Sequence, residues 1–144
     1  EFAEMGDMQQ LIDSQKAKRK YFSEKEIWQV AWQLTLALLH CHSHDIIHRD
    51  VKPMNVLITK ERVFKLGDLS ESTFVNKETY LRSKQVGTPF YSVLDNKEVG
   101  YDHRADIFSL GVVMYHMAAL DVPFYDKSLK GIMNKILYKQ PLPF

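Results

Sequence analysis

One stretch of this sequence, residues 105–119, is apolar almost all the way round when it is placed on a helix. Its large apolar side chains are Ile107, Phe108, Leu110, Val112, Val113, Met114 and Met117. A surface helix carries such side chains on one face, whereas a helix that is apolar on every face has to be covered by other elements. The stretch therefore predicts a central helix that the other elements of the fold cover.

A second helix is predicted to begin at Ser23. Ser23 and Glu26 match a capping box, in which each side chain binds a free backbone amide of the first turn. Apolar residues then recur at helical spacing (Ile27, Val30, Ala31, Leu34 and Leu38), and Trp28, Trp32 and Leu39 widen this stripe. We expect this helix to be largely buried and to end between His42 and Asp45.

Two shorter helices are expected near the ends of the chain. Asp7 is a good N-cap for the first, which has an apolar side made by Met8, Leu11 and Ile12 and fades into a basic connector at residues 16–20. The other, residues 129–138, is amphipathic.

Short β-type runs at residues 56–58 and 63–66 are predicted to form a hairpin. Its open end would bring Asn55 and Asp68 close together. The polar residues 71–86 are predicted to form a long loop.

Composition narrows the classes of function. The 144 residues are 45% apolar and 26% charged, as in one globular domain. A net charge of +1 gives no bulk electrostatic reason to expect nucleic acid or a membrane as partner, and no apolar run reaches the roughly 20 residues of a spanning helix. A single cysteine excludes an internal disulfide and suits a reducing compartment. We expect a cytoplasmic or nuclear protein.

Residues 48–55, His-Arg-Asp-Val-Lys-Pro-Met-Asn, hold most of the chemical information. Asp50 can take a proton, Lys52 can neutralise phosphate and Asn55 can hold a metal ion. Asp68, thirteen residues after Asn55, is a further oxygen ligand. Such groups suit phosphoryl transfer, in which positioning and charge stabilisation provide most of the catalysis.

These residues resemble the H-R-D-x-K-P-x-N loop and the D-F-G motif of eukaryotic protein kinases. Residues 106–111 resemble the D-x-W-S-x-G motif of that family, and residues 33–38 and 66–68 look most like the NIMA-related serine/threonine kinases. The resemblance covers the whole chain. It implies the helical C-terminal lobe of the kinase fold, with short β-hairpins at the catalytic and metal-binding loops, from the hinge to roughly the αG helix.

The resemblance implies transfer of the γ-phosphate of ATP to a serine or threonine hydroxyl of a protein substrate. Asp50 would be the catalytic base, and Lys52 would neutralise the transferring phosphate. Asn55 and Asp68 would hold Mg²⁺. Thr88 would contact the catalytic aspartate and favour serine and threonine substrates.

The nucleotide-binding residues also follow from the resemblance. The carbonyl of Glu1 and the backbone of Ala3 would meet adenine, Asp7 would reach the ribose, and Leu57 would form the floor under the base. An apolar column made by Met8, Val113 and Met117 would lie beneath that floor.

Arg49 suggests control by a phosphorylated loop, because arginine beside the catalytic aspartate is a ready partner for phosphate. Ser83 or Thr79 would be the acceptor. Both also remain open to the simpler reading as ordinary loop residues.

The sequence departs from the family at Leu69-Ser70, where Phe-Gly is usual, and at residues 93–95, where Val-Leu-Asp replaces Ala-Pro-Glu. Residues 1–144 hold no glycine-rich loop and no V-A-I-K lysine. The N-lobe and the last C-lobe helices are expected to lie outside them, so that this piece alone would bind ATP weakly and turn over negligibly. Two hypotheses remain: a lobe of a working kinase, or a pseudokinase that serves as a docking scaffold.

Overall fold

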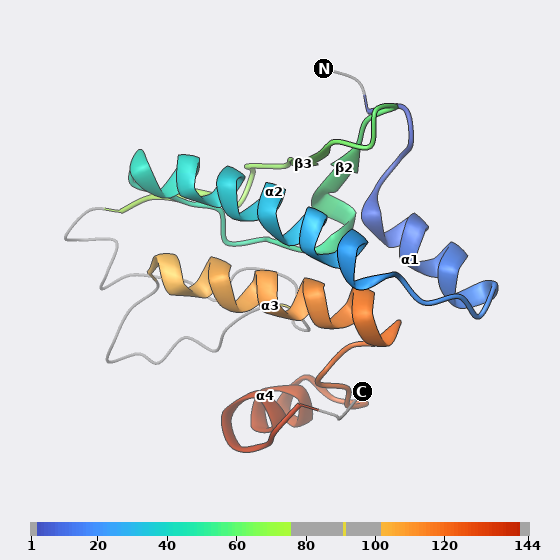
Figure 1. The fold of residues 1–144 in the computed structure, drawn as a ribbon. Helices are drawn as coiled ribbons and strands as arrows, with labels where there is room; N and C mark the ends of the chain where they lie inside the picture. The colour runs from blue at the N-terminus through green and yellow to red at the C-terminus, as the bar shows by residue number, and fades with distance from the viewer. Residues whose placement is uncertain (1–2, 76–90, 92–101, 142–144) are drawn as a thin grey trace.

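The computed structural model describes residues 3–75, 91 and 102–141, which form a mainly helical fold (Figure 1). In chain order the elements are α1 (Met8–Ala17), α2 (Glu24–Ser43), β1 (Ile46–Ile47), a 3₁₀ turn η1 (Pro53–Asn55), β2 (Val56–Ile58), β3 (Phe64–Leu66), β4 (Thr73–Phe74), α3 (His103–Ala119) and α4 (Leu129–Tyr138). The predicted fold class is confirmed.

Helix α3 lies alongside α2 and runs in the opposite direction, the β2–β3 hairpin lies along another side of α2, and α1 lies near the N-terminal end of α2 (Figure 1). The buried residues of α3 are Ala105, Asp106, Ser109, Leu110, Val112, Val113, His116 and Met117. Four of them (Leu110, Val112, Val113 and Met117) meet buried side chains of α1, α2 and the hairpin in one core cluster, and Ala105 packs with Ile47 in a second, smaller cluster. The prediction of a central helix at residues 105–119 is confirmed, although Ile107 is half exposed.

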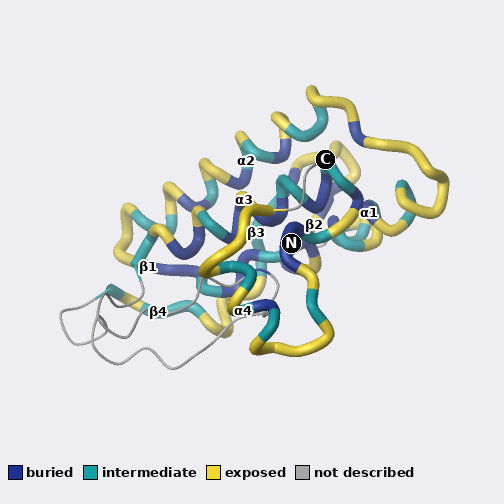
Figure 2. The backbone as a smooth tube through the Cα atoms, turned by 90° about the horizontal axis from the view of Figure 1, so that it is seen from below, coloured by how far each residue is buried: buried dark blue, intermediate teal, exposed yellow. Residues whose placement is uncertain are grey.

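Helix α2 was expected to be largely buried, and this expectation is wrong. Only Val30, Leu34 and Leu38 are buried, whereas Trp28, Trp32 and Leu39 are each more than 60% exposed. Successive helical residues are rotated by about 100°, so these three side chains lie well away from the buried stripe. Figure 2 shows the alternation of buried and exposed backbone along α2. Even this helix of 20 residues is not apolar enough to cross a membrane, and neither is any other helix in the described ranges.

Helix α1 is longer than predicted and includes part of the expected basic connector. The Asp7 side chain accepts a hydrogen bond from the Gln10 backbone N–H, as predicted for an N-cap. The helix continues to Ala17, because Met8 and Ile12 are fully buried and hold the first turns, and Lys16 in the last turn complements the helix dipole.

The β2–β3 hairpin is confirmed, with Val56 opposite Leu66 and Ile58 opposite Phe64. A second pairing was not predicted: β1 pairs antiparallel with β4, Ile46 with Phe74 and Ile47 with Thr73. The prediction of a loop beginning at residue 71 is therefore wrong for Thr73 and Phe74. Two residues are too few to show the alternation by which a strand is recognised, and only the long-range partner makes them one.

The Ser23 cap of α2 gives a first prediction. Glu26 N–H donates to Ser23 Oγ (3.3 Å), and Ser23 N–H donates to Glu26 Oε2 (2.8 Å). These Ser23 hydrogen bonds, the backbone bond first, lower the pKa of Glu26. Ser23→Ala should lower the free energy of unfolding by about 1 kcal/mol at neutral pH, as loss of an N-cap usually does. Urea unfolding measures it.

The effect should depend on pH in one direction. Because the pKa of Glu26 is lowered in the folded state, its contribution is complete above the ordinary carboxyl pKa and is lost as the pH falls through the folded value. The difference between wild type and Ser23→Ala should therefore shrink on acidification. Ser14→Ala, within α1, is the control. An equal loss in both variants would refute the cap.

Candidate active site

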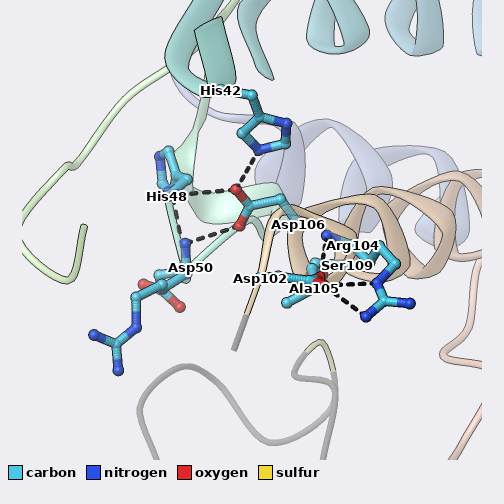
Figure 3. Close-up of polar contacts among 9 residues, drawn as sticks. His42, His48, Asp50, Asp102, Arg104, Ala105, Asp106 and Ser109 are labelled. Atoms are coloured by element: carbon cyan, nitrogen blue, oxygen red, sulfur yellow. Dashed lines mark hydrogen bonds and ion pairs between the residues drawn. The ribbon is translucent and has the colours of Figure 1, made fainter. Parts of the chain in front are cut away.

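A buried carboxylate joins α3 to the loop that follows β1. Asp106 is fully buried, and its Oδ1 accepts the backbone N–H of Arg49 (2.9 Å). Its Oδ2 accepts the backbone N–H of His48 (2.9 Å) and lies 2.8 Å from Nε2 of His42, at the end of α2 (Figure 3). A carboxylate only accepts hydrogen bonds, so His42 Nε2 carries the hydrogen in this contact. One side chain thus holds two successive backbone amides.

The backbone of this loop is held in an unusual conformation. Arg49 has φ of 70° and Asp68 has φ of 61°. Residues other than glycine rarely adopt this left-handed region, and such positions cluster at functional sites because the surrounding structure has to hold them there. The two hydrogen bonds that Asp106 accepts come from the N–H of Arg49 itself and from the N–H of His48 just before it.

The side chains of Asp50, Lys52 and Asn55 converge. Lys52 Nζ lies 2.6 Å from Asp50 Oδ2, and the side-chain Nδ2 of Asn55 donates to the same oxygen (3.0 Å) and to the Asp50 carbonyl (2.8 Å). Asp50 and Asn55 are each only 7% exposed. The carboxylate is therefore oriented by two donors while its edge still reaches solvent.

The hairpin brings Asp68 to the same place. Gly67 N–H donates to the Asn55 carbonyl (2.8 Å), and the Gly67 carbonyl lies 3.0 Å from His48 Nε2. His48, fully buried, thereby joins the two loops. The predicted proximity of Asn55 and Asp68 at the open end of the hairpin is confirmed to this extent, because Asp68 follows Gly67 directly.

Asp68 is exposed, and its pKa is lowered. The main cause is the side chain of Ser70, followed by the Ser70 backbone N–H, which lies 3.2 Å from Asp68 Oδ1, and a smaller contribution comes from Lys52. Ser70 itself is not among the described residues with positive φ. Serine in place of the usual glycine is thus not strained here, and it favours the ionised carboxylate.

Two oxygen-bearing side chains, Asn55 and Asp68, fit the preference of Mg²⁺ for hard ligands. The described ranges contain no group of three or more His, Cys, Asp or Glu residues that could form a complete metal cage. Mg²⁺ does not need one, since it commonly takes one or two carboxylates and completes its shell with water and substrate phosphates. The donor set fits this ion.

The N-terminal segment lies against the hairpin. Met5 N–H donates to the Ile58 carbonyl (3.0 Å), Ile58 N–H donates to the Gly6 carbonyl (2.9 Å), and Asp7 forms an isolated bridge with Leu57. Leu57 is 37% exposed, whereas Met8, Val113 and Met117, the residues of the predicted apolar column, are buried in the core cluster. Ala3, Asp7 and Leu57 are therefore on one side of the molecule, although the Asp7 carboxylate already accepts hydrogen bonds from Gln10.

Several predicted positions cannot be compared with the structure. Glu1, Thr79, Ser83, Thr88 and residues 93–95 lie outside the described residues. Of the predicted site, the structure brings together Arg49, Asp50, Lys52, Asn55 and Asp68.

Sequence reasoning missed Asp106 and His42 as site residues. Asp106 was seen only as part of a motif at the beginning of the central helix. A carboxylate within an otherwise apolar helix was the available signal, because a buried charge needs partners. His42 gave no such signal, since a histidine near a helix end is common.

Comparisons with known proteins agree with this geometry. Residues 1–142 match the protein kinase domain family. The chain is 37% identical over 142 residues to the human serine/threonine-protein kinase Nek2, covering 94% of this chain and 32% of that protein. It is 37% identical over 142 residues to the probable serine/threonine-protein kinase nek3 of Dictyostelium discoideum, covering 95% and 13%. It is also 37% identical over 143 residues to the putative serine/threonine-protein kinase A of Trypanosoma brucei brucei, covering 95% and 33%.

These matches confirm the predicted resemblance to NIMA-related serine/threonine kinases. The chain spans about a third or less of the length of these relatives.

The Asp106 contacts predict a large effect of a small change. Asp106→Asn keeps the size of the side chain but leaves one acceptor oxygen, so its N–H₂ group faces either the Arg49 amide at the Oδ1 position or the His48 and His42 donors at the Oδ2 position. Buried donors without acceptors are costly, so we expect the free energy of unfolding to fall by about 3 kcal/mol. Urea unfolding measures this fall. The exposed Asp13→Asn is the matched control and should change it by less than about 0.5 kcal/mol. Equal effects of the two variants would contradict the role of Asp106.

Proposed function

We propose, from the premise that this chain belongs to the protein kinase family, that the protein containing it transfers the γ-phosphate of ATP to serine or threonine hydroxyls of a protein. The observation that carries this proposal is the oriented Asp50 carboxylate, which Lys52 and Asn55 contact through the same oxygen. A positioned carboxylate next to a cation is what transfer to a hydroxyl requires.

In this reaction Asp50 acts on the acceptor. The substrate hydroxyl donates its hydrogen bond to the Asp50 carboxylate, and its oxygen attacks the γ-phosphorus. The bond between the γ-phosphorus and the β–γ bridging oxygen breaks, ADP leaves, and the hydroxyl proton passes to Asp50. Lys52, with Nζ 2.6 Å from Asp50, carries the positive charge that offsets the transferring phosphoryl group. Thr88 is proposed to contact this aspartate.

Asn55 and Asp68 are the proposed ligands of Mg²⁺. When bound, the ion neutralises charge on the phosphate oxygens. The chain contributes a carboxylate that Ser70 keeps ionised and an amide whose nitrogen is already bound to Asp50. Of that amide, the oxygen is therefore the atom suited to a cation.

ATP is proposed to lie between the N-terminal segment and Leu57. The bridge between Asp7 and Leu57 supports this placement, as does the buried Met8 below it. The backbones of Glu1 and Ala3 would meet adenine. Because residues 1–144 contain no glycine-rich loop or V-A-I-K lysine, we infer that transfer also needs a second lobe, and that this piece alone turns over negligibly.

Regulation through Arg49 is part of the proposal. A guanidinium beside the catalytic loop can pair with a phosphate on Thr79 or Ser83 and so order the segment that carries it.

A docking scaffold is the second candidate function. The exposed Trp28, Trp32 and Leu39 on α2 favour it, because large apolar side chains that gather on a surface often mark contact with a partner. If the full-length protein does not bind ATP in the presence of Mg²⁺, the docking scaffold becomes the better proposal.

The decisive experiment compares two aspartates in the full-length protein. Asp50→Asn should lower kcat for phosphate transfer to a serine/threonine substrate protein by about 10²- to 10⁴-fold, because general-base catalysis is lost, while ATP binding persists. Asp68→Ala should abolish Mg²⁺-dependent ATP binding measured by calorimetry. The exposed Asp121→Asn is the control and should leave both unchanged.

Two results would count against the kinase proposal. One is an Asp50→Asn protein that keeps more than a tenth of its activity. The other is a wild-type protein that binds no ATP in the presence of Mg²⁺, and this result would favour the scaffold.

A further inference from the structure

His103 is the first residue of α3 and lies three residues before Asp106. Its ring packs against the ring of His42, with the centroids 4.5 Å apart and the planes tilted by 55°. Tilted aromatic rings at this separation are in favourable contact. His42 is the side chain whose Nε2 reaches Asp106, so His103 contacts the group that holds the anchoring carboxylate.

The Nε2 atom of His103 does not explain its position. Its Nε2 is buried and has no hydrogen-bond partner within the described part of the chain. The cap of α3 is made by others, since the Asp102 side chain accepts from the Arg104 backbone and pairs with the Arg104 guanidinium at 2.6 Å. What His103 contributes is therefore the packing of its ring against the ring of His42.

His42 needs a neighbour of this kind. Its side chain is 15% exposed, and within the described residues its ring makes one hydrogen bond, to Asp106. A single hydrogen bond to Asp106 fixes one distance but lets the His42 ring turn about that bond. The His103 ring, packed against the His42 ring, restricts this rotation. A fixed His42 keeps its N–H on Asp106 Oδ2, and this oxygen also receives the backbone N–H of His48.

We propose that His103 is a positioning residue, which holds His42 against Asp106 by ring packing and thereby stiffens the backbone at His48 and Arg49. Any effect of His103 on catalysis rests on the proposed function, in which Asp50, the residue directly after His48 and Arg49, is the catalytic base. The effect of His103 on the backbone does not depend on the proposed function.

The test uses NMR on the full-length protein to measure hydrogen exchange of the His48 and Arg49 backbone amides. These are the two amides that donate hydrogen bonds to Asp106. His103→Ala should speed their exchange roughly tenfold through local opening, with no change at Val30 and Leu34 in α2. His103→Phe keeps a ring and drops the unpaired nitrogen, and it should stay within about twofold of wild type at the same amides.

The chain provides a matched control. His40 and His44 form a similar pair, with centroids 4.6 Å apart and a tilt of 51°, and the His44 ring makes its hydrogen bond to the His40 carbonyl and not to Asp106. His44→Ala removes this pair and should leave the exchange of His48 and Arg49 unchanged.

A double-mutant cycle separates positioning from general destabilisation. If His103 acts through His42, then His103→Ala should have no further effect on these amides in a His42→Ala background. The same cycle measured on kcat should show the same coupling, with KM for ATP unchanged.

Three outcomes overturn the inference: uniform acceleration of all amides in His103→Ala, a Phe variant that behaves like the Ala variant, or full additivity with His42→Ala. An inactive wild-type protein would overturn the proposed function instead, and the exchange data would still decide the role of His103.

Discussion

A single buried carboxylate organises the chemistry of this chain. Asp106 lies more than fifty residues from the two backbone amides that it accepts. Without it, those amides would lose the acceptor that they share, and Arg49 would lose a hydrogen bond that supports its left-handed conformation. The orientation of Asp50, and through His48 the link to the loop of Asp68, depend on this conformation. The central helix is therefore both the middle of the core and the support of the candidate site.

Features encoded by neighbouring residues could be predicted from the sequence. The Ser23–Glu26 capping box, the Asp7 cap and the hairpin depend on contacts within a few residues, and each is present in the structure. The octapeptide likewise brings Asp50, Lys52 and Asn55 together through one short turn. Local sequence was enough, because the distances are short and the backbone leaves few alternatives.

Features that depend on distant partners could not be predicted. The pairing of β1 with β4 involves only two residues on each side. The roles of His42 and Asp106 follow from the antiparallel packing of α2 on α3, which places the end of one helix beside the beginning of the other. The prediction that Trp28 and Trp32 are buried was also wrong, because it rested on hydrophobicity alone. An apolar pattern shows which residues share a helix face, but not how much of that face other elements cover.

The exposed side of α2 carries both tryptophans of the chain. Each is about two-thirds exposed in the folded state, so its indole already meets water before unfolding. Intrinsic fluorescence of this segment therefore reports on what touches the outer surface of α2 far more than on the integrity of the core. The optical signal of these residues is a sensor of surface contact, and circular dichroism is the better measure of folding for a chain this rich in helix.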